Sequence, residues 1–150
     1  MMFGEKRFEE GQAFPIFVYP LLLLGCVAML LPPHHWSLVA VPLVIMLCAG
    51  NLLYMSTRVT GRTIRVRFGA LVPFYVRTID VGEIEGVEAG RYSPLAEYGG
   101  WGIRGMGSNM ALNARGNLGV RLHLTRGRIL MIGTQRPEEL ADAIRQAQAS

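Results

Sequence analysis

Two long uncharged apolar stretches in the first third of the chain limit most strongly what it can fold into. Residues 14–31 read FPIFVYPLLLLGCVAMLL and residues 36–54 read WSLVAVPLVIMLCAGNLLY, with only PPHH between them. A helix that spans a membrane needs about 20 mostly apolar residues, and each stretch comes close to that length. The sequence therefore predicts a transmembrane helical hairpin over residues 14–55. The alternative, a helix pair buried in a soluble core, is less consistent with two such unbroken runs.

The distribution of basic residues predicts the orientation of this hairpin. Lys6 and Arg7 precede the first stretch and several arginines follow the second, whereas the connection at residues 32–35 has no Lys or Arg. Cytoplasmic loops carry an excess of Lys and Arg, so both ends of the hairpin are expected in the cytoplasm. The predicted organisation is a cytoplasmic segment at residues 1–13, the hairpin at residues 14–55 and a cytoplasmic domain at residues 56–150.

The pattern of apolar residues changes after residue 55 and becomes alternating, beginning with TIRVRF at residues 63–68. Alternation of apolar and polar residues is typical of half-buried strands. The same pattern predicts seven strands, at residues 63–68, 74–79, 84–89, 101–104, 110–114, 120–125 and 128–132. A glycine-containing turn at residues 125–128 indicates a hairpin between the last two.

A helix is predicted at the end of the chain. Pro137 suits a first helical turn, and Leu140, Ala141, Ile144 and Ala147 form one apolar stripe. The expected fold class is α+β: the transmembrane hairpin, followed by a seven-stranded antiparallel sheet that a C-terminal helix closes.

This order of elements is accompanied by YGGWGIRG at residues 98–105 and by GVRLHLTRGRILMIGTQRPEELADAI near the end. Together they resemble membrane-anchored bacterial pleckstrin-homology-like proteins. The resemblance implies a partly open barrel capped by the helix, a location in the bacterial inner membrane, and binding rather than catalysis. It does not imply inositol-phosphate binding, because the loop at residues 69–73 is apolar.

Several patterns that suggest chemistry do not form a catalytic or cofactor site. Residues 100–105 spell G-x-G-x-x-G but lie among predicted strands, not between a strand and a helix. His34 and His35 have no third ligand nearby, and His123 has no nucleophile or carboxylate close in sequence. We therefore expect no enzymatic activity, no cofactor and no metal. An enzyme would require a cleft that joins His123 to an acidic residue such as Glu97.

Four arginines after the second apolar stretch are the first group of candidate functional residues. They are Arg58, Arg62, Arg65 and Arg67, and two of them share one face of the first predicted strand. Each could add on the order of 1 kcal/mol of attraction to an anionic membrane leaflet, so they are candidates for binding lipid headgroups. The alternative is that they only determine membrane topology. Nucleic acid is not an expected partner, because the basic residues are scattered along the chain.

The long loop at residues 91–110 is the second candidate, because long aromatic loops often make contacts. It contains Tyr92, Tyr98 and Trp101 among flexible glycines. These side chains either cover the barrel or bind a protein partner. Covering is favoured for Trp101, and both roles stay open for Tyr92 and Tyr98.

These features together predict an integral membrane protein whose cytoplasmic domain is a binding or scaffold module. Its expected partners are the membrane itself, a protein, or anionic lipid headgroups. The alternative function is that of a small accessory subunit of a transporter or envelope assembly, in which the hairpin makes the contacts.

Overall fold

The computed structural model describes residues 6–14, 19–20, 23, 27, 51 and 53–150. In order along the chain, its elements are β1 (Lys6–Ala13), β2 (Tyr54–Thr60), β3 (Thr63–Phe68), β4 (Tyr75–Asp80), β5 (Ile84–Arg91), α3 (Pro94–Tyr98), β6 (Gly102–Met106), β7 (Asn109–Asn113), β8 (Leu118–Leu124), β9 (Arg128–Gly133) and α4 (Pro137–Gln148).

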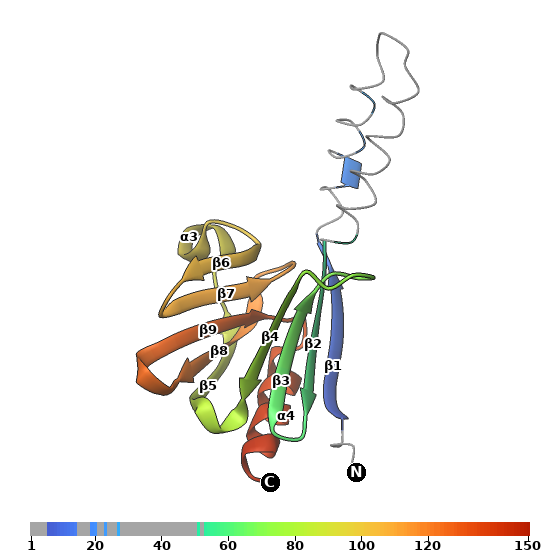
Figure 1. Cartoon of the computed structure of the whole chain (residues 1–150). Helices are drawn as coiled ribbons and strands as arrows, with labels where there is room; N and C mark the ends of the chain where they lie inside the picture. Colours follow the sequence, from blue (N-terminus) through green and yellow to red (C-terminus); the bar gives the residue numbers. More distant parts are fainter. Residues whose placement is uncertain (1–5, 15–18, 21–22, 24–26, 28–50, 52) are drawn as a thin grey trace.

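The strands form two sheets. The first has four strands in the order β1-β2-β3-β4, and the second has five in the order β5-β8-β9-β7-β6. Neighbouring strands are antiparallel except β7 and β9, which run parallel. In Figure 1 the four strands of the first sheet stand side by side, and α4 lies near the end of the molecule where β4 and β5 meet.

One hydrophobic core joins the two sheets and α4. In β3, Ile64, Val66 and Phe68 are buried, whereas Arg65 and Arg67 alternate with them and point to the other face. Strand geometry requires this, because successive side chains point to opposite faces of a sheet. The opposite face of this first sheet is therefore free to carry polar side chains.

The helix α4 covers one end of the core. It begins at Pro137, and its Leu140 and Ile144 are fully buried in the core cluster. The helix contacts β1, β2, β5 and β8, which belong to both sheets. It therefore closes the space between the sheets, as expected from its apolar stripe.

The strand positions agree with the alternating pattern, but the predicted architecture is wrong. All seven strands expected after residue 62 are present, with ends that differ by at most one or two residues. The described residues form nine strands in two sheets, however, and not one seven-stranded antiparallel sheet. β1 and β2 were not expected, and β7 pairs in parallel with β9.

The polar residues on the inner face of β1 explain why this strand was missed. Among the side chains of β1 that the structure describes, Phe8, Glu10 and Gln12 are buried, and two of these three are polar. Alternation of apolar and polar residues cannot reveal such a strand. The segment at residues 1–13, which was expected to precede the fold, thus contributes the edge of the first sheet.

The predicted transmembrane hairpin is also corrected. Among the residues that the structure describes, no helix is long and apolar enough to cross a membrane. Most of residues 14–55, including His34 and His35, lies outside them. The fold is a mostly β arrangement with the C-terminal helix α4.

The predictions that depended on the hairpin are corrected with it. They are the integral membrane location with cytoplasmic ends, the membrane-tethered scaffold that binds lipid headgroups or a protein, and the accessory subunit of a transporter or envelope assembly. The described residues instead form a fold of two sheets and a C-terminal helix.

Buried polar contacts attach β1 to the end of β9 and to the connection that leads into α4. The carboxylate of Glu10 accepts hydrogen bonds from Thr134 Oγ1 and, over 3.0 Å, from the backbone N–H of Gln135. Gln12 Nε2 donates to the carbonyl of Gly133 over 2.9 Å. These contacts satisfy the Glu10 carboxylate and the amide nitrogen of Gln12, which would be costly to bury alone, and they fix β1 in the sheet.

Candidate functional site

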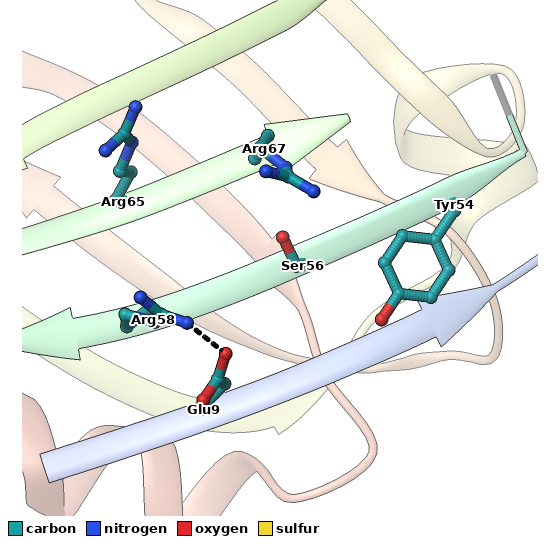
Figure 2. A pocket seen from close by; sticks show the side chains of 6 residues that line it. All are labelled: Glu9, Tyr54, Ser56, Arg58, Arg65 and Arg67. Carbon is teal, nitrogen blue, oxygen red and sulfur yellow. Dashed lines mark hydrogen bonds and ion pairs between the residues drawn. The ribbon is translucent and has the colours of Figure 1, made fainter. Parts of the chain in front are cut away.

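A shallow hollow of about 230 Å³ lies on the outer face of the first sheet, over β1, β2 and β3. It is lined by Glu9, Tyr54, Ser56, Arg58, Arg65 and Arg67. Figure 2 shows these side chains on three neighbouring strands, with the arginines coming from β2 and β3. The hollow therefore gathers three of the four arginines that the sequence indicated as candidates.

Strand register brings the arginines of the hollow together. Arg58 of β2 lies directly opposite Arg65 of β3, and Ser56 lies opposite Arg67. All of them face outward, because the residues between them in each strand are buried. Like charges directly opposite each other on a sheet destabilise it. An anion bound between them would offset this repulsion.

The three guanidinium groups differ in the contacts they already make. Arg58 forms an ion pair with Glu9 of β1, drawn as a dashed line in Figure 2. Arg67 Nη2 donates to the carbonyl of Ala70 over 3.1 Å, while its buried Nε finds no acceptor in the part of the chain that is described. Arg65 is exposed, and within the same described part its guanidinium has no hydrogen-bond or ion-pair partner. Arg65 and Arg67 therefore have donors available for a ligand.

Hydrogen bonds of Asn51, called the Asn51 contacts below, fix the loop that Arg67 contacts. Asn51 Oδ1 accepts hydrogen bonds from the backbone N–H groups of Leu71 and Val72, at 2.7 and 2.9 Å. Asn51 Nδ2 donates to the carbonyl of Val72 over 2.8 Å, and the backbone N–H of Ala70 donates to the carbonyl of Asn51. The carbonyl of Ala70, which Arg67 contacts, is thus held from both sides.

Tyr54 forms one wall of the hollow and depends on a glycine beside it. A Cβ atom on Gly11 of β1 would collide with Oη and Cζ of Tyr54. Only glycine leaves space for the phenol ring to lie across β1. Figure 2 shows the ring extending from β2 toward β1, so its hydroxyl adds a neutral donor at the rim.

Arg62, the fourth predicted arginine, lies elsewhere. It belongs to the turn between β2 and β3, and it lines a different surface depression together with Val81, Gln148 and Ser150. The sequence placed Arg62 in one group with the other three because it is close to them along the chain. The turn separates it from the outer face of the strands.

The predicted aromatic loop is used mainly within the molecule. Tyr92 is buried, its ring meets Tyr98 edge-on at a centroid distance of 6.1 Å, and its Oη accepts a hydrogen bond from Asn113 Nδ2 over 2.8 Å. Trp101 is half-buried, and its Nε1 donates to the carbonyl of Gly116 over 3.0 Å. The role of these side chains in binding a partner protein stays a prediction.

The segment between Tyr92 and Trp101 contains the short helix α3, which was not expected. Ser93 Oγ accepts from the backbone N–H of Ala96, and Glu97 Oε1 accepts from the backbone N–H of Ser93 over 2.8 Å. Pro94 begins the helix and Gly99 ends it in the left-handed conformation, with φ of 71°. Ser-Pro at the start and Gly at the end are sequence signals that would have revealed this helix.

His123 lies beside an acidic residue, as an enzyme would require, but this residue is Glu88 and not Glu97, and His123 does not line the hollow on β1, β2 and β3. Its Nε2 lies 3.2 Å from Glu88, whereas Glu97 pairs with Arg121 over 2.9 Å. The His123–Glu88 pair lies on the second sheet, whereas the Arg121–Glu97 pair joins that sheet to α3, and all four side chains are at least partly exposed. In the described part of the chain, no group of three or more His, Cys, Asp or Glu side chains could hold a metal ion.

Three residues of the hollow were not predicted as site residues: Glu9, Tyr54 and Ser56. Glu9 belongs to the unexpected strand β1, and Tyr54 and Ser56 belong to β2, whose start had been assigned to the hairpin. Polar residues alternating with Met55, Thr57 and Val59 are the signal that could have found β2.

The chain matches no family model, and neither a curated protein nor a solved structure gives a significant match. The resemblance to pleckstrin-homology-like proteins therefore stays a prediction.

Proposed function

We propose that this protein binds an anionic ligand, without catalysis, in the hollow on the outer face of β1, β2 and β3. The observation that carries the proposal is the register of Arg58, Arg65 and Arg67, which places three cations around one depression. Guanidinium groups present planar sets of donors that match phosphate and carboxylate.

The composition of the hollow supports anion binding more than binding of an apolar molecule. Besides its charged side chains, the hollow has two uncharged polar groups, the hydroxyls of Tyr54 and Ser56, which donate hydrogen bonds. Its volume of about 230 Å³ is below the range of about 300–1,000 Å³ that is usual for drug-sized ligands. A small group rich in acceptor oxygens fits these properties.

Binding is favoured over catalysis because the hollow lacks the usual catalytic groups. Among the described residues that line it there is no His, Cys or Lys, and its single carboxylate, Glu9, is paired with Arg58. A general base must have a free position within reach of the proton that it removes. Arginine has only hydrogen-bond donors and no acceptor, so it does not supply one.

The test compares two variants of the full-length protein by titration calorimetry with inorganic phosphate. The double variant Arg65→Gln/Arg67→Gln removes two cations of the hollow. The control Arg62→Gln removes one cation from the turn between β2 and β3, outside the hollow. We expect the double variant to lose affinity about tenfold or more, because hydrogen bonds to charged groups contribute about 1.5–3 kcal/mol.

The control should bind phosphate within about twofold of the unaltered protein, because an exposed charge outside the hollow is largely screened by salt. A loss of binding free energy in the control about half as large as that in the double variant would show that binding follows net charge and not the hollow. Absence of saturable phosphate binding in the unaltered protein would contradict the proposed function directly.

A further inference from the structure

We infer that the ligand of the hollow carries two or more anionic groups, as a short polyphosphate does, and that Glu9 competes with one of them for Arg58. This inference rests on the proposed anion binding and specifies the ligand class and the regulation of the same site. It is carried by the spacing of the arginines and by the position of Glu9.

Figure 2 shows the three guanidinium groups directed to different parts of the hollow. Arg65 and Arg67 are two residues apart on one face of β3, so their Cα atoms are separated by about 6.6 Å. Arg58 lies on β2 directly across from Arg65, at about 4.5–5.5 Å between Cα atoms, and diagonal to Arg67. Its guanidinium is directed toward Glu9 and β1, whereas those of Arg65 and Arg67 lie over β3 (Figure 2), so one anionic group suits the pair on β3 and a second is needed at Arg58.

Glu9 occupies the place of that second group. It lies opposite Arg58 in the pairing of β1 with β2, and its carboxylate contacts the Arg58 guanidinium. It is the single acidic residue among the described residues that line the hollow. A carboxylate on a neighbouring strand can thus bind the cation that a ligand would otherwise bind.

The ion pair is exposed enough for a ligand to replace it. The side chain of Arg58 is 55% exposed and that of Glu9 33% exposed. Exposed ion pairs of this kind are weak, and displacing one lowers ligand affinity by about fivefold at most. Glu9 therefore lowers the affinity without closing the site, and it does so only for ligands that reach Arg58.

The experiment measures the affinities of orthophosphate and tripolyphosphate for the full-length protein and for Glu9→Gln. Loss of the carboxylate should tighten tripolyphosphate binding by about two- to fivefold, and orthophosphate binding by clearly less. The matched control is Glu83→Gln, which removes the same charge from an exposed pair with Arg128 that lies outside the hollow. It should change neither affinity appreciably.

A second variant tests the role of Arg58 independently. Arg58→Gln should retain orthophosphate binding but lose most of the preference for tripolyphosphate. Equal effects of Glu9→Gln and Glu83→Gln on tripolyphosphate, with both probes still bound in the hollow, would overturn this inference while leaving the proposed function intact. Failure of the unaltered protein to bind either probe would overturn the proposed function itself.

Discussion

The phenol of Tyr92 lies against Ala111 and Met131, and its Oη accepts a hydrogen bond from Asn113. Burial raises the pKa of Tyr92 from 10.0 to about 12, although the hydrogen bond from Asn113 acts in the opposite direction. Burial disfavours the charged phenolate, so the fold holds this side chain in its neutral form. The chemistry of this residue is therefore determined by its packing.

This shift predicts how stability changes at high pH. The folded state keeps the Tyr92 proton above pH 10 while the unfolded chain releases it, so this contribution to stability is complete below pH 10 and is lost as the pH rises toward about 12. The measurement is a titration of tyrosinate absorbance in the folded protein and in Tyr92→Phe. The difference between the two curves should have its midpoint well above pH 10, and a midpoint near 10 would contradict the assignment.

Two glycines that face each other on neighbouring strands differ in the space available for a side chain. Gly90 of β5 and Gly119 of β8 lie directly opposite each other. A Cβ atom on Gly119 would lie 2.8 Å from the carbonyl oxygen of Ile132, whereas a Cβ atom on Gly90 would meet nothing within 4 Å. The packing therefore requires a glycine at position 119 of β8 but not at position 90 of β5.

Alanine substitutions at this pair should differ in their effect on stability. Gly119→Ala forces β8 away from β9 and should lower the free energy of unfolding by about 1–3 kcal/mol, the usual cost of overpacking. Gly90→Ala should be neutral or slightly stabilising, because it restricts the unfolded chain. Urea denaturation of both variants checks this expectation, and equal destabilisation would contradict the steric explanation.

A second prediction concerns the loop between β3 and β4, which the Asn51 contacts hold. Asn51→Ala removes the acceptor for the amides of Leu71 and Val72, so these amides should exchange with solvent about two- to tenfold faster, as expected for hydrogen bonds of about 0.5–1.5 kcal/mol. Asn109→Ala is the control, because its side chain makes no hydrogen bond within the described part of the chain. Unchanged exchange at Leu71 and Val72 would show that the Asn51 contacts do not hold the loop.

For the molecule as a whole, β1 joins the first sheet to the end of β9 and the connection before α4 through Glu10 and Gln12. Removing the Glu10 carboxylate leaves Thr134 Oγ1 and the amide of Gln135 without their acceptor. Glu10→Ala should therefore destabilise the protein by about 1–3 kcal/mol. Glu85→Ala, at an exposed position of β5, should change the stability by less than about 0.5 kcal/mol. Thermal unfolding of both variants tests this, and similar transition temperatures would argue against the attachment of β1 through Glu10.

How far the sequence predicted this fold depended on which side chains face inward. The strands from β3 onward bury apolar residues such as Ile64, Val66 and Phe68, so alternation revealed them. β1 buries Glu10 and Gln12, and no periodic apolar signal marks it. The division into two sheets and the parallel pairing of β7 with β9 depend on contacts between distant residues, which a local pattern does not contain.

The site was predicted only in part, for a related reason. Alternation placed Arg65 and Arg67 on one face of β3, and Arg58 was a candidate with them; the register of β2 with β3 places Arg58 beside Arg65. Glu9 comes from a strand that pairs with β2 across a long interval of sequence. Arg62 was grouped with the others by proximity along the chain, and the turn separates it from them.

The most direct test of anion binding in the hollow is an NMR titration that follows the arginine Nε–Hε signals of the full-length protein as tripolyphosphate is added. The signals of Arg58, Arg65 and Arg67 should shift together and reach saturation, because these side chains line the hollow. Those of Arg62 and Arg126, which lie outside it, should hardly change. Uniform, unsaturated shifts of all five arginines would contradict a specific site in the hollow.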